Sequence, residues 1–278
     1  MAETPLTRYR AVASPTVPRS SGRPAALLLL ASLPMLVFLA APLAALILRS
    51  APAQLLANVA NPEVAQAIGL SVSTTALTVA LAVIFGTPLA YLLAHRRFRG
   101  RTALDTLIDL PMVLPPSVAG IALLVAFGRR GLLGQYFSAA GLDIAFTQTA
   151  VVLAQTFVAA PFYIKAAIAG FASIDQELEQ AAALDGASPA QVFRFVTAPL
   201  AWTSLLGGAV MTWARALGEF GATIIFAGNF PGRTQTMPLA IYIGFELDLN
   251  VALTLAVILL AVSFGVLLVV KGVLRGCV

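Results

Sequence analysis

The sequence predicts an all-α integral membrane protein with six transmembrane helices, and its composition and the distribution of its charges lead to that prediction. Of the 278 residues, 59% are apolar and only 10% are Asp, Glu, Lys or Arg, whereas a soluble domain carries about 25% charged residues. The mean hydropathy is +0.92. So few charges could not cover a water-facing surface, which excludes disordered, nucleic-acid-binding and ordinary soluble proteins.

Six windows free of charged residues are long enough to form spanning helices, which need about 20 mostly apolar residues. None shows the alternation of a barrel strand. The windows are 24–48, 64–94, 110–128, 144–164, 195–214 and 249–270.

The first window predicts a transmembrane helix over 24–49. Its apolar run is too long for the core of a secretory signal. Residues 1–23 are rich in Ser, Thr, Pro and Arg and have almost nothing to bury, so we expect a mobile cytoplasmic tail.

The basic residues predict the orientation, because they collect on the cytoplasmic side of spanning helices. If the N-terminal tail is cytoplasmic, four basic residues lie on the outer side of the membrane: Arg49, Arg129, Arg130 and Arg233. Twelve fall inside: Arg8, Arg10, Arg19, Arg23, Arg96, Arg97, Arg99, Arg101, Lys165, Arg194, Lys271 and Arg275. Both termini, including a C-terminal tail at 272–278, are therefore expected in the cytoplasm.

The third window contains Pro115 and Pro116, which must interrupt its helix because proline lacks a backbone donor. Such a break at membrane depth is tolerated where protein or an aqueous cavity surrounds it. A helix lining the transport pathway and a kink for packing both remain open. Ser117, Thr149 and Gln155 are candidates for polar lining.

Arg215 and Glu219 interrupt the apolar segment 205–228 and lie one helical turn apart. Charges in that setting are more often functional than incidental. The two readings are a gate, with hinges at Gly218 and Gly221, and a structural ion pair between helices.

The segment 173–199 is predicted to form two short cytoplasmic helices. Ser173 with Gln176 and Ser188 with Gln191 match capping boxes, and Gly186 stands where a left-handed residue would end the first helix. Pro199 marks a break before the fifth span.

This segment is also acidic, although helices that lie on the anionic inner leaflet are usually basic. A protein partner is therefore favoured over an amphipathic connector on lipid.

No catalytic, metal or cofactor site is predicted. A single histidine, His95, and a single cysteine, Cys277, give no metal-ligand set and are interpreted as incidental. The two lysines are not preceded by glycine, so there is no nucleotide-phosphate loop.

The segment Gln180-Ala181-Ala182, followed by Gly186, Val196 and Pro199, resembles the EAA loop of the inner-membrane permease subunits of ABC importers. In that family the loop forms a coupling helix that docks on the ATPase subunit. Two positions depart from the pattern: Gln180 stands where Glu is usual, with Glu179 one residue earlier, and Ala198 replaces the usual Leu. The resemblance implies ATPase-coupling roles for Glu179, Gln180, Ala181, Ala182, Gly186, Val196 and Pro199.

The resemblance covers about residues 64–271, the expected permease core with its coupling loop at 173–199. LPMVLPPSVAG at 110–120 and ARALGEFGATIIFAGNFPGRTQTMPLAIY at 214–242 look like the permeases of molybdate importers. Tungstate and sulfate permeases share much of this pattern, so these anions stay open.

The resemblance implies a type I ABC importer fold in a bacterial or archaeal inner membrane. It also implies a homodimer that binds ABC ATPase subunits and a periplasmic oxyanion-binding protein, and that moves molybdate by alternating access. The rival is an ATP-independent secondary transporter or channel. Matching interrupted helices in two halves would favour that rival, and the sequence shows no such repeat.

Overall fold

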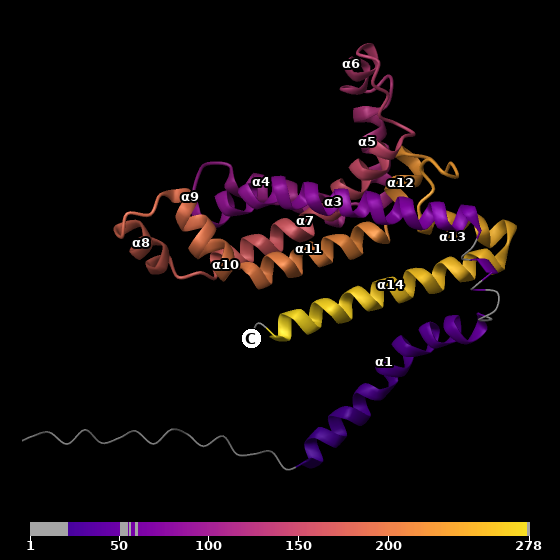
Figure 1. Cartoon of the computed structure of the whole chain (residues 1–278), viewed down its shortest axis with the longest axis horizontal. Helices are drawn as coiled ribbons and strands as arrows, with labels where there is room; N and C mark the ends of the chain where they lie inside the picture. Colours follow the sequence, from indigo (N-terminus) through magenta and orange to yellow (C-terminus); the bar gives the residue numbers. More distant parts are fainter. Residues whose placement is uncertain (1–21, 51–54, 56, 59–60, 277–278) are drawn as a thin grey trace, which may run out of the picture. The chain divides into compact units, whose positions relative to one another are not determined.

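The computed structural model describes residues 22–50, 55, 57–58 and 61–276 (Figure 1). Most of the predicted tail at 1–23, and Cys277, lie outside the described residues. The chain divides into two compact units, residues 1–48 and 49–278. Nearly all of helix α1 (Gly22–Arg49) lies in the first unit, and its apolar residues from Leu27 onward are largely exposed. A helix of this kind suits a lipid environment, as the first window predicts.

All the regular secondary structure among the described residues of the second unit is helical (Figure 1). It begins with α3 (Pro62–His95), α4 (Arg101–Val113), α5 (Pro116–Phe127), α6 (Gly134–Ala139) and α7 (Gln148–Ala172). A loop region follows with α8 (Gln176–Leu184), α9 (Pro189–Val192), the π-helical turn η1 (Phe193–Thr197) and α10 (Ala198–Leu200). The last helices are α11 (Trp202–Leu217), α12 (Gly221–Phe226), α13 (Met237–Leu247) and α14 (Leu249–Gly276).

Four helices, α1, α3, α7 and α14, are long and apolar enough to cross a membrane, and two broken pairs can supply the remaining spans. Helices α4 and α5 meet at an angle of 116°, and the segments 189–200 and 202–217 meet at 72°. The predicted interruption at Pro115 and Pro116 is confirmed, and the predicted break before the fifth span falls at Ala201, just after Pro199.

Two helices extend beyond the charge-free windows of the sequence. The third helical segment begins at Arg101 rather than at residue 110, so Asp105 and Asp109 lie on a helix. The fourth extends to Ala172 and contains Lys165. Both extensions have one physical reason, because Lys165 Nζ lies 2.7 Å from Asp105 and 2.9 Å from Asp109 and so compensates charge within the helices.

Helix α7 packs between α3 and α11 through small residues. A Cβ added at Gly208 of α11 would lie 2.7 Å from Ala166 Cβ, and one at Gly86 of α3 would lie 3.0 Å from Tyr163 and Ile164. Small residues let membrane helices approach closely. A buried hydrogen bond of 3.2 Å from Thr78 to Gln155 further joins α3 to α7, so Gln155, a candidate for polar lining, is enclosed instead.

Helices α13 and α14 pack against each other at the other end of the chain, where Gly244 approaches Ala252. Met237 N–H at the start of α13 donates to Ser71 Oγ of α3 over 2.7 Å. Helix α14 continues through Gly276, so it includes much of the expected tail at 272–278.

Candidate functional site

The predicted coupling segment forms the two short helices α8 and α9, but α8 starts differently from the prediction. Its N-cap is Asp175, whose carboxylate accepts the Glu177 N–H over 3.0 Å. The predicted capping box from Ser173 was wrong, because the Ser173 hydroxyl donates instead to the Gly170 carbonyl at the end of α7. Asp175 takes the cap because its carboxylate is a good acceptor near a helix N-terminus.

The turn between α8 and α9 is built as the sequence indicates. Gly186 is left-handed, with φ of +92°. The Ala187 N–H donates to the Ala182 carbonyl and the Gly186 N–H to the Ala183 carbonyl, both over 3.1 Å, which is the Schellman arrangement. At the start of α9, the Gln191 side chain accepts the Ser188 N–H over 2.8 Å, as a capping box requires.

The surface of α8 is open along almost its whole length. No residue of the helix is fully buried, and Leu184 is 88% exposed. Gln180 and Ala181 are also exposed, whereas Ala182 is half-buried. In α10 and the preceding turn, Pro199 is exposed and Val196 is half-buried. The segment therefore presents exposed apolar side chains between acidic ones, which suits a protein partner.

Glu179 is the exception on α8, because its side chain turns into the protein and is only 13% exposed. Its Oε2 lies 3.2 Å from His95 Nε2 at the end of α3. Its Oε1 accepts a hydrogen bond of 2.5 Å from the Thr197 hydroxyl at the end of η1. His95, which was interpreted as incidental from the sequence, therefore has a structural contact.

A second group of candidate residues lies where two helix breaks meet. Helix α5 starts at Pro116, directly after its N-cap Pro115, and packs against α12, which starts after a break at Gly218–Phe220. A Cβ added at Gly221 would lie 2.7 Å from Pro116 Cβ and 3.5 Å from Ser117 N. The structure thus brings Pro116, Ser117 and Gly221 together.

Arg215 and Glu219 form an ion pair at the break between α11 and α12. Arg215 Nη1 lies 2.7 Å from Glu219 Oε2, and the Arg215 side chain is 30% exposed whereas that of Glu219 is 1% exposed. The second carboxylate oxygen, Oε1, accepts the Ala222 N–H over 2.8 Å. One buried carboxylate therefore both neutralises the arginine and satisfies a backbone donor left free by the break.

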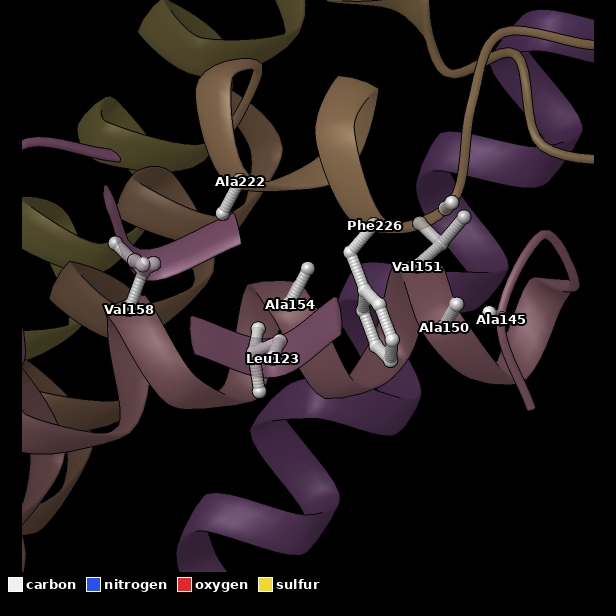
Figure 2. Close-up of a cluster of buried hydrophobic side chains, with 10 residues drawn as sticks. Leu123, Ala145, Ala150, Val151, Ala154, Val158, Ala222 and Phe226 are labelled. Carbon is white, nitrogen blue, oxygen red and sulfur yellow. The ribbon is translucent and has the colours of Figure 1, made fainter. Parts of the chain in front are cut away.

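An apolar cluster fixes α5 and α12 onto α7. Leu123 of α5, Phe226 of α12 and three residues of α7, Ala150, Val151 and Ala154, are buried together. Figure 2 shows these side chains directed into the space between the three helices. The short helices after the breaks are therefore packed in place rather than loosely attached.

The break retains an open side. Pro115, Ser117 and Gly218 are exposed, and a cavity of about 480 Å³ lies beside Gly218, Phe220 and Tyr242. Thr149, near the start of α7, is exposed as well. Gly218 at the break therefore lines accessible space, and the partly exposed Arg215 lies three residues earlier, on α11.

Sequence reasoning missed two contacts that join distant segments. Asp105 and Asp109 are one helical turn apart and both face Lys165 of α7, so their spacing was a signal for one helix face. The pairing of His95 with Glu179 had no such local signal. Among the described residues, no group of three or more His, Cys, Asp and Glu is arranged to hold a metal ion.

Comparison with known proteins adds the following similarities. A family profile described as a binding-protein-dependent transport system inner membrane component matches residues 86–271. The chain is 44% identical to the molybdenum transport system permease protein ModB of Mycobacterium tuberculosis, across 86% of this chain and 89% of the relative. It is 35% identical to the molybdate/tungstate transport system permease protein WtpB of Thermococcus kodakarensis, across 85% of this chain and 90% of the relative.

Among solved structures, the chain resembles one of a bacterial alginate ABC transporter in complex with an alginate pentasaccharide-bound periplasmic protein. The TM-score is 0.71 at 17% sequence identity, with 92% of this chain and 94% of that chain covered. At this identity the likeness concerns the fold.

Proposed function

The chain belongs to the family of binding-protein-dependent transport system inner membrane components, the multi-pass permease subunits of ABC importers, and we propose that it carries molybdate. The observation that supports this cargo most strongly is the extended identity to a molybdenum permease. Tungstate is the second candidate, favoured by the likeness to a molybdate/tungstate permease. Sulfate follows from the shared sequence pattern alone.

A permease subunit is not itself an enzyme, so the energy must come from a partner. We infer that ABC ATPase subunits hydrolyse ATP and that a periplasmic oxyanion-binding protein delivers the anion. The permease itself acts as a homodimer in lipid. Selectivity can then reside in the delivery protein, and weak binding within the permease is sufficient.

Both termini are proposed to lie in the cytoplasm. The contact between His95 and Glu179 supports this, because it joins the basic segment after α3 to the predicted cytoplasmic loop at 173–199. At the opposite end of α3, Glu63, Pro231 and Asp248 line a single cavity of about 280 Å³. Segments assigned to the same side of the membrane are thus near one another.

The coupling role belongs to the segment from α8 to α10. Its exposed residues Gln180, Ala181 and Leu184 are proposed to enter the ATPase groove, with Gly186 setting the turn between the helices. Ala182, Val196 and Pro199 are half-buried or at the bend, and are proposed to shape the segment.

The pathway role belongs to the meeting of the two breaks. Pro115 caps α5, and Pro116 and Ser117 begin it. Gly218 and Gly221 flank the buried carboxylate of Glu219. Arg215 is proposed to contact the anion as it passes, while Glu219 holds the Arg215 side chain in place. The purely structural role of this pair is the alternative.

The substrate is tested by ATP hydrolysis in the assembled transporter, reconstituted with its ATPase and binding protein. Molybdate, tungstate and sulfate are compared at equal concentration, each with the cognate binding protein. We expect the strongest stimulation with molybdate. Stimulation by sulfate but not by molybdate would overturn the proposed cargo, and stimulation by none of the three would overturn oxyanion transport.

A further inference from the structure

The carboxylate of Glu179 connects three elements that are distant in sequence. Its two oxygens contact His95 on α3 and Thr197 on η1, while its backbone belongs to α8. Thr197 is fully buried and His95 is 16% exposed on its side chain. The link therefore sits at the inner face of the coupling segment, where water competes less for its hydrogen bonds.

His95 is itself held in a fixed orientation. Its Nδ1 lies 3.2 Å from the Tyr91 carbonyl oxygen, and its ring lies 4.2 Å from the Tyr91 ring, centroid to centroid. Tyr91 in turn makes edge contacts with Phe171 of α7 and Phe193 of η1. The end of α3, the end of α7 and η1 thus form one aromatic cluster around the histidine.

The Thr197 end of the link is also distinctive. Thr197 closes the π-helical turn η1, and π-helical turns inside helices are often found at functional sites. After this turn the chain bends by 72° into α11, which carries Arg215. The hydrogen bond from Thr197 to Glu179 therefore joins α8 directly to the segment that leads into α11.

The exposed face of α8 does not contain Glu179. Leu184 and Glu177 are exposed, whereas both oxygens of Glu179 are occupied inside the chain. A carboxylate used in this way is poorly placed to pair with a separate protein.

We propose that Glu179 is a positioning residue that ties the coupling helix to α3 and to the π-helical turn, rather than a residue of the ATPase-docking face. This inference rests on the proposed ATP-driven transport. In this proposal, His95, Glu179 and Thr197 transmit the movement of α8 to the membrane-spanning helices. Loss of the link should leave the ATPase bound, but more ATP should then be hydrolysed for each molybdate imported.

The test uses the complete transporter in proteoliposomes and measures ATP hydrolysed per molybdate imported, together with the amount of ATPase that co-purifies. Glu179→Ala and Thr197→Val should retain the ATPase and raise the ATP used per molybdate by roughly fivefold or more. The double variant should be no worse than Glu179→Ala, because both changes remove one link. Glu177→Ala removes an exposed carboxylate on the same helix, so it is the matched control for the link and should leave the ATP used per molybdate unchanged.

Leu184→Ala provides the contrast for docking and should lower ATPase co-purification. If Glu179→Ala lowers co-purification as Leu184→Ala does, Glu179 is a docking residue and the proposal is wrong. An unchanged ATP-to-molybdate ratio in Glu179→Ala would also overturn it. Should Glu179→Ala fail to assemble in the membrane, Thr197→Val decides in the same way, since it removes only the hydroxyl. A wild-type transporter that imports no molybdate would instead overturn the proposed function, and with it this inference.

Discussion

Two carboxylates in this permease have similar sets of partners but are built from different parts of the chain. Glu219 pairs with Arg215, four residues earlier, and accepts the N–H of Ala222, three residues later. Glu179 pairs with His95 and Thr197, which lie on other elements. Glu219 thus shapes one local break, whereas Glu179 joins separate helices.

The difference has a mechanical meaning. An ion pair within one segment, such as Arg215 with Glu219, stabilises the bend of that segment and moves with it. Such a pair can form part of a hinge or gate. A link between elements makes them move together, so it can transmit movement from α8 to the spans. The two carboxylates should therefore respond differently to mutation, with a loss of stability at Glu219 and a loss of coupling at Glu179.

The largest effect is expected from removing the cation beside the buried carboxylate. Arg215→Ala leaves Glu219 buried without its partner, at a cost of about 3–5 kcal/mol of unfolding free energy. Glu219→Ala should cost less, because the Arg215 side chain is 30% exposed and can be hydrated. Thermal unfolding of the purified permease in detergent measures both.

The double variant Arg215→Ala with Glu219→Ala separates the two readings of the pair. Part of the stability should return, because no unpaired charge remains, although the Ala222 N–H still lacks its acceptor. A stable double variant without molybdate uptake indicates a gate, whereas recovered uptake indicates a structural pair. Wild-type stability in both single variants would contradict the burial of Glu219.

The contact between the two breaks gives the next largest effect. Gly221→Ala places a methyl group 2.7 Å from Pro116 Cβ, and such overpacking costs about 1–3 kcal/mol. Gly207→Ala is the matched control, because nothing lies within 4 Å of the added methyl group and alanine stabilises a helix interior relative to glycine. The two variants should shift the unfolding temperature in opposite directions. An unchanged or raised unfolding temperature in Gly221→Ala would show that α5 and α12 do not approach closely.

The turn after α8 should show a smaller cost with a specific consequence. Gly186→Val puts a branched side chain at a φ of +92°, which costs about 1–2 kcal/mol. Nothing lies within 4 Å of an added Cβ there, so the cost comes from the backbone alone. Gly186→Asn, which tolerates this conformation, should retain ATPase co-purification, whereas Gly186→Val should lose part of it. Equal co-purification of the two variants would contradict the role of the turn.

The smallest effect is expected at Asp143, an exposed carboxylate that pairs with an arginine as Glu219 does. Asp143 accepts a hydrogen bond from Ser138, and this bond, with a further contribution from Arg129, holds the pKa of its carboxyl below the ordinary value of 3.8. A lowered pKa in the folded state adds stability above pH 3.8, and this stability is lost as the pH falls through the folded pKa. Asp143→Asn should therefore lower the unfolding temperature slightly at pH 6, and the difference should shrink below pH 3.8. A difference independent of pH would exclude this cause.

The comparison of the two carboxylates also shows what the sequence could predict. The spacing of Arg215 and Glu219 and the glycines around them indicated an ion pair at a helix break, because every partner lies within one turn. The Pro115–Pro116 break and the left-handed Gly186 were likewise local signals. Apolar windows of spanning length indicated the membrane helices for the same reason.

Long-range contacts could not be predicted in this way. Nothing in the composition around His95 indicates that α8 returns to it, and Lys165 gives no sign of its partners on α4. These pairings depend on how α3, α4, α7 and α8 pack, which is set by the whole fold. The residues that join elements are therefore the ones for which the structure was needed.

ATP-dependent uptake of molybdate into proteoliposomes tests the central claim most directly. The vesicles contain this permease with its ATPase, and the binding protein and molybdate are added outside. We predict uptake only when ATP is present on the ATPase side, and no uptake when the ATPase is omitted. Equal uptake without ATP or without the ATPase would contradict the account and would indicate a secondary transporter or channel.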